Sequence, residues 1–342
     1  MTGIQKNRRR LVAAAALAPA GLYFTPIHAA TPAMSALAGK AAAEKPAVWY
    51  ESSRPDEADK VIAAFNKVFP NVKVRQESIP GGNGVAARVT QESSAGAATA
   101  DIVTVGGGET AQLLKTDLIA AQNYESLGVD PRLVFSKRAV NTAVTVYCIV
   151  YNKTMVTDRP AGWNDLLLPK YKGNVGTWVR AAAFAELSKN WGEARVMDFY
   201  TKFLAQGPMY FNSAAPLAQS VASGEIALGL GSYHNSIAPQ KRGAPIDMVS
   251  LDPTPVSSIF SFVTGKAKSP ATAALFIAWL ASPEGNSAYE AAVGRGSALI
   301  PSTQTYKFLA GRQISEWPLD DKAPDAAIFE KMNRMVSGAK VR

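Results

Sequence analysis

Cysteine and histidine are almost missing from this chain. Its 342 residues include one cysteine, Cys148, and two histidines, His28 and His234. A single cysteine excludes a disulfide within the chain and the paired cysteines of a structural zinc site. Cys148 stands in a β-branched and aromatic run, which favours a small buried side chain. No cysteine stands directly after the apolar stretch at residues 11–22, where a lipid would be attached, so we expect that the protein is not a lipoprotein.

Clusters of charge are missing as well. Charged residues make up 18% of the chain and hydrophobic residues 47%, which predicts a packed core rather than disorder. The net charge of +9 would fall to +5 without residues 1–38, which carry four basic and no acidic side chains. The other basic residues are spread out and not interleaved with aromatics, so we expect no nucleic-acid partner. A mild positive charge is compatible with an anionic ligand.

The motifs of common enzyme classes are also absent. The sequence has no G-x-S-x-G elbow, no P-loop and no H-E-x-x-H helix. Residues 337–340 match S-x-x-K, but they lie in a polar tail without the companion motifs. No carboxylate near His234 in the sequence could orient its ring for acid–base chemistry. We therefore expect no enzymatic activity and no cofactor.

No apolar run is long enough to span a bilayer. Basic residues between positions 6 and 10 precede an alanine-rich apolar stretch at 11–22, and small residues follow. This pattern is typical of a secretory signal peptide. We place the signal peptide at residues 1–38, with cleavage after Ala38 as the best site and Ala30 as an earlier option.

The leader fits two export routes. Arg8 and Arg9 resemble the pair of a twin-arginine signal, while an ordinary Sec leader explains the basic start equally well. We expect residues 39–45 to be a linker. The mature protein is then expected in the periplasm.

Strand-like and helix-like segments alternate along the rest of the chain. This alternation predicts a mostly parallel sheet covered by helices. Strands are expected at 47–52, 72–77, 101–105, 145–151, 175–178, 209–211, 226–230, 246–251 and 258–264. Helices are expected at 56–69, from the turn 81–84 to about 93, and at 109–114, 181–191, 195–205, 217–223 and 271–281.

Four ordered blocks resemble a known family. Residues 145–173 combine a buried strand, a tryptophan-bearing helical turn and a Pro-Lys-x-x-Gly hairpin, and the other blocks are 50–74, 211–231 and 269–289. In this order they resemble the extracellular solute-binding proteins of ABC transporters. The likeness is to type II periplasmic binding proteins, in the branch of the ferric-iron binders and their organic-ligand relatives.

The resemblance implies a two-lobed α/β fold in which each lobe is a mostly parallel sheet covered by helices. Crossing hinge strands join the lobes, which close on a ligand. We assign residues 46–145 and 252–300 to lobe 1, and residues 146–251 and 301–342 to lobe 2. The implied partners are a small-molecule ligand and a membrane permease with its ATPase, and the protein is expected to be a monomer.

Ligand-binding residues are expected where strands end and helices begin, because helix amides point into the cleft there. Arg180 is the strongest single candidate for ligand binding, since its guanidinium can bind a carboxylate or phosphate with two hydrogen bonds. The alternative is a surface arginine paired with Glu186 or Asp198. The candidates in these turns are Ser52, Ser53, Arg54, Gly82, Asn83, Gly107, Gly108, Glu109, Trp178, Arg180, Asn212, Ser213 and Ala214.

Ser232 and Tyr233 complete the set of candidates. Ferric-binding relatives use two adjacent tyrosines at the matching place, whereas here only Tyr233 matches and His234 takes the second position. We therefore favour a small anionic organic solute, a carboxylate or a phosphate or phosphonate. The alternatives are Fe³⁺ held by Tyr233, His234 and Glu109 with a bound anion, and a sensory binding module for a membrane receptor.

Overall fold

The computed structural model describes residues 30–342, so most of the expected signal peptide lies outside the described residues. Lobe 1 is built on three parallel strands, β1 (Ala47–Glu51), β2 (Val74–Ser78) and β3 (Ile102–Gly106), with β1 in the middle. A helix starts soon after each strand ends. These helices are α2 (Pro55–Val68), α3 (Gly82–Ser94) and α4 (Gly107–Leu113).

Two late helices close the core of lobe 1. They are α9 (Pro270–Leu280) and α10 (Pro283–Val293), and every residue of α9 from 272 to 280 is buried. A helix that is apolar on all sides needs cover on all sides. Aromatic rings supply much of it: Phe276 packs against Trp49 and Phe65, with ring centroids 5.1 Å apart in both pairs.

Lobe 2 repeats the arrangement with β6 (Val175–Trp178), β7 (Met209–Phe211) and β8 (Leu228–Ser232). They are parallel, and β6 lies between the other two. The covering helices include α5 (Ala182–Trp191), α6 (Glu193–Leu204), α7 (Ala214–Ser223), α8 (Tyr233–Lys241) and α12 (Ala323–Met335). The expected helical turn after residue 162 is a 3₁₀ helix at Trp163–Leu167.

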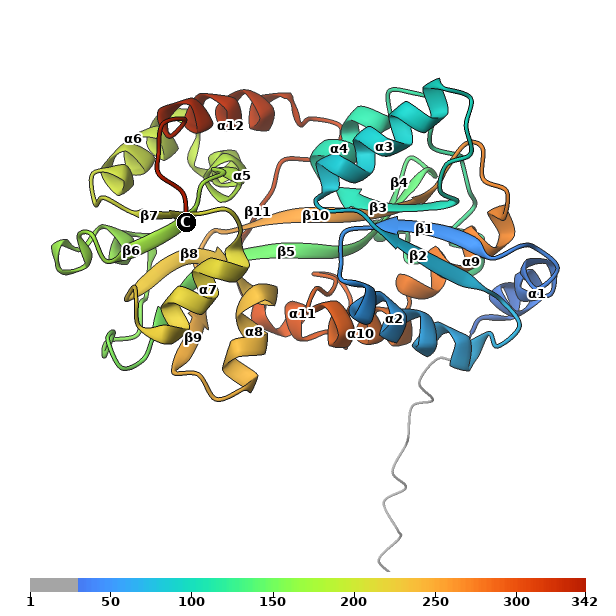
Figure 1. Cartoon of the computed structure of the whole chain (residues 1–342), viewed down its shortest axis with the longest axis horizontal. Helices are drawn as coiled ribbons and strands as arrows, with labels where there is room; N and C mark the ends of the chain where they lie inside the picture. Colours follow the sequence, from blue (N-terminus) through green and yellow to red (C-terminus); the bar gives the residue numbers. More distant parts are fainter. Residues whose placement is uncertain (1–29) are drawn as a thin grey trace, which may run out of the picture.

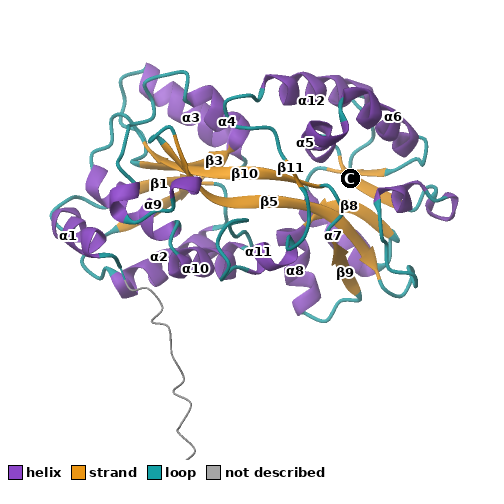
Figure 2. Cartoon of the chain, turned by 180° about the vertical axis from the view of Figure 1, so that it is seen from behind, coloured by secondary structure: helices purple, strands orange, loops and turns teal. Residues whose placement is uncertain are grey.

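Two long antiparallel strands, β5 (Ala139–Asn152) and β10 (Thr254–Val263), join the lobes. β5 pairs with β10 as far as Val146 and with β8 from Tyr147 onward. Within residues 30–342 the result is one sheet in the order β2-β1-β3-β10-β5-β8-β6-β7 (Figure 1). Helices lie on both of its faces (Figure 2). The expected two-lobed α/β fold with crossing strands is confirmed.

Three short strands, one short α-helix and three further 3₁₀ helices complete the fold. The 3₁₀ helices are Glu125–Leu127, Pro131–Leu133 and Pro169–Tyr171. The strands β4 (Val134–Phe135) and β9 (Ile246–Val249) pair with β5, and β11 (Ile314–Ser315) pairs with β10. The helix α11 (Gln304–Phe308) precedes β11. In residues 30–342, no helix has the length and apolar character needed to cross a bilayer.

The start of the described chain differs from the expected linker. Residues Pro32–Ala41 form helix α1, which packs on α9 with Met34 and Ala41 buried. The carboxylate of Glu44 then accepts hydrogen bonds from the first amides of α9. Residues 39–45 are therefore part of the lobe 1 body. Cleavage after Ala38 would remove most of α1, whereas the earlier option at Ala30 leaves the helix whole.

The last segment also departs from a simple assignment. Leu319 packs in lobe 1 with Val85 and Phe262, whereas Ile328 and Met332 pack in lobe 2. Residues 301–342 are thus not confined to lobe 2. Contacts with residues far away in the sequence decide which lobe each part of the segment joins, and the local sequence pattern does not encode those contacts.

A buried ionic cluster holds this last segment against the lobe junction. Lys322 lies 2.7 Å from Glu186 on α5 and 3.9 Å from Asp325. Glu316 accepts hydrogen bonds from the backbone and hydroxyl groups of Ser258 on β10. Burial raises the pKa of all three carboxyl groups, and that of Glu186 to about 8. One lysine faces a buried carboxyl group, that of Glu186, and two half-buried ones, so full ionisation of the cluster is unfavourable.

We expect Glu186 to make stability fall as pH rises. A carboxyl group with a raised folded pKa binds more protons in the folded state between its ordinary pKa and about 8, so its stabilising contribution is lost through that window. Glu186→Gln mimics the protonated form. From pH 5 to pH 8 the free energy of unfolding of the wild type should fall relative to Glu186→Gln by at least about 1 kcal/mol.

The matched control is Glu193→Gln, which removes an exposed carboxylate paired with Lys331. Its unfolding free energy should stay within about 0.5 kcal/mol of the wild type at each pH. Urea unfolding followed by circular dichroism at several pH values measures both differences. Parallel pH profiles for wild type and Glu186→Gln would show that Glu186 is ionised throughout.

Candidate functional site

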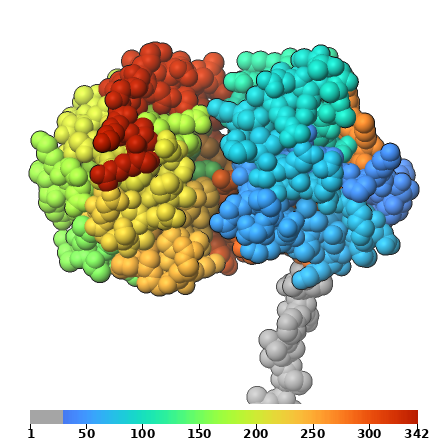
Figure 3. Space-filling model, in the orientation of Figure 1, coloured from blue at the N-terminus to red at the C-terminus, as the bar shows by residue number. Residues whose placement is uncertain are grey.

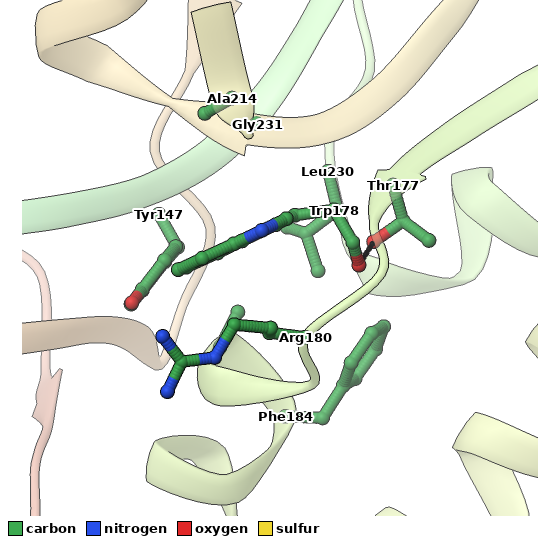
Figure 4. Close-up of a pocket in the computed structure, with 9 residues that line it drawn as sticks. Tyr147, Thr177, Trp178, Arg180, Phe184, Ala214, Leu230 and Gly231 are labelled. Carbon is green, nitrogen blue, oxygen red and sulfur yellow. Dashed lines mark hydrogen bonds between the residues drawn. The ribbon is translucent and has the colours of Figure 1, made fainter. Parts of the chain in front are cut away.

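A pocket opens in lobe 2 where β6 and β8 end and α5 and α7 begin (Figure 4). It is a narrow pocket, with a cavity volume of about 10 Å³ in this conformation, and it opens to solvent. The carboxyl ends of parallel strands meet at one edge of a sheet, which is where α/β proteins bind ligands. The lining residues are Tyr147, Thr177, Trp178, Arg180, Ala183, Phe184, Ala214, Leu230 and Gly231.

The pocket lies beside the junction of the lobes. Tyr147 stands at the point where β5 exchanges β10 for β8 as its partner. Its hydroxyl group lies 3.2 Å from the hydroxyl of Ser257 on β10. A furrow separates the two lobes on the surface (Figure 3). The pocket is therefore placed where a closing movement of the lobes would cover it.

Arg180 carries the only charge in the pocket lining. Its guanidinium carbon lies 5.2 Å from the ring centres of both Trp178 and Phe329. Such contacts between a cation and aromatic faces restrict the arginine without neutralising it. Arg180 is exposed and forms no ion pair with any of residues 30–342. Its guanidinium lies at one side of the pocket, near the Tyr147 ring (Figure 4).

The alternative partners proposed for Arg180 are engaged elsewhere. Glu186 pairs with Lys322 at 2.7 Å, and Asp198 pairs with Lys202 at the same distance. The interpretation of Arg180 as a surface arginine bound to one of these carboxylates is therefore wrong. Its guanidinium keeps its donors available.

Trp178 forms a wall of the pocket. Its indole N–H donates a hydrogen bond of 2.8 Å to the backbone carbonyl of Asn212, which ties the end of β6 to the turn before α7. Ala214 begins α7 and lines the pocket, whereas Asn212 and Ser213 are exposed in the turn beside it. Three of the expected residues, Trp178, Arg180 and Ala214, thus line one pocket.

The sequence reasoning missed Tyr147 and two residues within the neighbouring strands, Thr177 on β6 and Leu230 on β8. The strand containing Tyr147 was expected, but its pattern is apolar on both faces and does not indicate which side chains reach a cavity. Burial raises the pKa of the Tyr147 phenol above its ordinary value. The hydroxyl is therefore neutral at physiological pH and can act as a hydrogen-bond donor.

The first turn of lobe 1 is largely occupied by its own hydrogen bonds. The amide and hydroxyl of Ser53 both donate to the carboxylate of Glu51. Arg54 is exposed and pairs with Asp56 and Glu57, each at 3.1 Å. Ser52 is half-buried and makes no side-chain hydrogen bond within the described residues. Of this turn, only Ser52 is left without an internal partner.

The other two turns of lobe 1 meet at Glu109. Asn83 and Gly108 are exposed, while Gly107 is buried against β10. A Cβ atom added to Gly82 would lie 3.5 Å from the carboxyl carbon of Glu109. The starts of α3 and α4 are therefore neighbours, with the Glu109 side chain between them.

Ser232 and Tyr233 do not line the pocket. The ring of Tyr233 stacks on Phe308 with centroids 4.3 Å apart, and burial raises its pKa to about 12. The hydroxyl of Ser232 accepts a hydrogen bond of 2.9 Å from the amide of Asn235. Tyr233 therefore serves packing, and Ser232 bonds to a neighbouring side chain at the start of α8.

The proposed iron ligands are not brought together. His234 is half-buried, with its Nε2 atom 2.7 Å from the Asn235 amide nitrogen, and desolvation of its ring lowers its pKa. Its backbone and Cβ pack against Gly294, whereas Glu109 lies against Gly82. Across residues 30–342, no three histidine, cysteine, aspartate or glutamate side chains gather as a metal site.

Comparison with known proteins agrees with this architecture. Residues 51–287 match the model of the family described as bacterial extracellular solute-binding protein. An uncharacterised protein of Haemophilus influenzae is 28% identical over 163 residues, and the match spans 45% of each chain. The chain thus aligns with under half the length of that curated relative.

Two solved structures share the fold. The periplasmic binding protein AfuA of Actinobacillus pleuropneumoniae, solved with fructose-6-phosphate, has a TM-score of 0.65 and 20% identity over 85% of this chain and 98% of its own. Iron-bound HitA of Pseudomonas aeruginosa has a TM-score of 0.70 and 18% identity over 85% and 99%. With the family model covering most of its length, this chain belongs to the bacterial extracellular solute-binding proteins, the ligand-binding components of ABC transporters.

Proposed function

We propose that this protein captures a small organic anion in the periplasm and delivers it to a membrane permease. The observation that carries the proposal is the free guanidinium of Arg180, which Trp178 and Phe329 hold at the mouth of the lobe 2 pocket. A planar guanidinium binds carboxylate, phosphate or phosphonate oxygens through two parallel hydrogen bonds. We infer that one of these groups is the part of the ligand that lobe 2 recognises.

The rest of the pocket supports an organic ligand. Trp178, Phe184 and Leu230 offer apolar surface, and the Tyr147 hydroxyl offers a hydrogen-bond donor. The helices α5 and α7 both begin at the pocket, and free amides at helix starts favour negative charge. A pocket that combines apolar walls with a few polar groups is typical of small-molecule sites.

Closure would couple binding to delivery. A ligand shifts the balance between open and closed lobes only through contacts that the closed form makes better. The pocket lies at the junction, where β5 passes from one lobe to the other, so lobe 1 can cover a ligand held by Arg180. The family's binding components are carriers, and the closed form would dock on the permease without chemical turnover.

The relatives bind both kinds of ligand that the sequence suggested. AfuA was solved with fructose-6-phosphate and HitA with iron. Iron remains the second candidate because of HitA, and the packing of Tyr233 and His234 argues against it in this chain. A sensory role would use the same lobes and differ only in the membrane partner.

Arg180→Ala should weaken binding of every anionic ligand. Loss of a two-pronged charged contact should lower affinity about 100-fold or more, equivalent to about 2.7 kcal/mol. Titration calorimetry with a panel of carboxylates, phosphonates and sugar phosphates measures the change. The control is Arg195→Ala, since Arg195 also lies over a tryptophan, Trp191, at 4.2 Å, but on α6. Equal affinities for wild type and Arg180→Ala would refute the assignment.

Iron should not produce a tyrosinate band. A phenolate at Tyr233 is unfavourable because burial raises its pKa to about 12. We expect no red absorption when Fe³⁺ is added with carbonate or phosphate, measured by visible spectroscopy. A band that appears in the wild type and disappears in Tyr233→Phe would replace the organic anion with iron as the ligand.

A further inference from the structure

Lobe 1 presents a carboxylate without a partner at the lobe junction. Glu109 lies in the first turn of α4, directly after β3, and its side chain is half-buried. Among residues 30–342 it forms no ion pair and its carboxylate accepts no hydrogen bond. A partly buried charge without a partner costs free energy, so this carboxylate needs an explanation.

Two glycines leave the space that Glu109 occupies. A Cβ atom at Gly106 would lie 2.8 Å from its Oε2 atom, and one at Gly82 would lie 3.5 Å from its Oε1 atom. A side chain at either position would push the carboxylate away. The end of β3 and the start of α3 therefore confine the glutamate rather than leaving it in open solvent.

The nearby cations are already engaged. Lys322 approaches Gly107, but its ammonium group lies 2.7 Å from Glu186. Arg54, at the start of α2, pairs with Asp56 and Glu57. Neither neutralises Glu109, and the carboxylate stays available to a positive group from outside the chain.

Strand register places the end of β3, three residues before Glu109, near the part of β10 that reaches the Arg180 pocket. Gly106 at the end of β3 pairs with Ile259 on β10. Ser257 lies two residues from Ile259 on β10, which is about 7 Å along a strand. The hydroxyl group of Ser257 contacts the hydroxyl group of Tyr147 in the pocket. In Figure 1, α4 lies at the side of lobe 1 that faces lobe 2. A negative group on lobe 1 and a positive group on lobe 2 thus border the same junction.

We propose that the ligand is a zwitterion, with an anionic group for Arg180 and a protonated amine for Glu109. This inference rests on the proposed function and narrows its ligand class to ω-amino acids and similar compounds. A ligand with negative charge at both ends would meet repulsion from Glu109 on closure, whereas an amine would gain an ion pair. Because the two groups sit on different lobes, both contacts form together only in the closed state, which is the condition for a ligand to drive closure.

A carboxylate in the first turn of a helix also stabilises that helix through the helix dipole. Glu284 provides the matched case, since it occupies the first turn of α10. A purely structural role for Glu109 would make Glu109→Gln behave like Glu284→Gln in ligand binding. Ligand preference therefore distinguishes a binding role of Glu109 from a purely structural one, whereas stability does not.

The test is titration calorimetry with matched probes of two to six carbon atoms. Each set contains an alkyl carboxylate, the ω-amino acid of the same length, the dicarboxylate and the alkylamine. In the wild type the best ω-amino acid should bind at least about 10-fold more tightly than its carboxylate and its dicarboxylate. Glu109→Gln should reduce this preference to within about 2-fold, Glu109→Lys should reverse it toward the dicarboxylate, and Glu284→Gln should leave it intact.

Failure of this inference can be told apart from failure of the proposed function. If carboxylates or sugar phosphates bind in an Arg180-dependent manner and an amine adds no affinity, the zwitterion is wrong and the anion carrier stands. Retention of the amine preference in Glu109→Gln would likewise refute the role of Glu109. If no anion in the panel depends on Arg180, the proposed function itself fails.

Discussion

The pairing of β5 with β10 is the interaction on which the molecule depends. β5 is 14 residues long and changes its partner from β10 to β8 between Val146 and Tyr147. One continuous strand therefore belongs to the central sheet of both lobes. Backbone hydrogen bonds hold this junction, while the other strands of each lobe end near it. The lobe 2 pocket forms there because strands and helix starts from lobe 2 meet the crossing strand.

Charge pairing separates structural residues from candidate binding residues. Lys322 is matched with Glu186 at the junction, and Arg54 is matched with carboxylates of its own helix. Arg180 and Glu109 lack such partners within the described residues, although both lie at turns that border the junction. Arg180 is exposed to solvent, whereas the half-buried carboxylate of Glu109 lacks a compensating charge. A ligand that bridges the two residues would supply an opposite charge to each of them.

The strands and helices could be predicted because their patterns are local. The expected strands at 175–178 and 209–211 match β6 and β7 residue for residue, and the apolar segment at 271–281 matches α9 within one residue. The candidate site was only partly predictable. Arg180 stands in a turn that the pattern identifies, whereas Tyr233 and His234 pack against Phe308 and Gly294, about 60 to 75 residues later. No local pattern in the sequence indicates that contact.

The sequence alone determined the alternation of strands and helices and the turns where charged residues stand, since both depend on neighbouring residues. The scarcity of cysteine is read directly from the composition. Tertiary structure decided which of those turns meet, that residues 39–45 belong to the body of lobe 1, and that Glu186 pairs with Lys322 rather than with Arg180. These outcomes depend on contacts between segments more than 100 residues apart. Packing and charge pairing across the fold determine these outcomes, and a local sequence pattern does not contain that information.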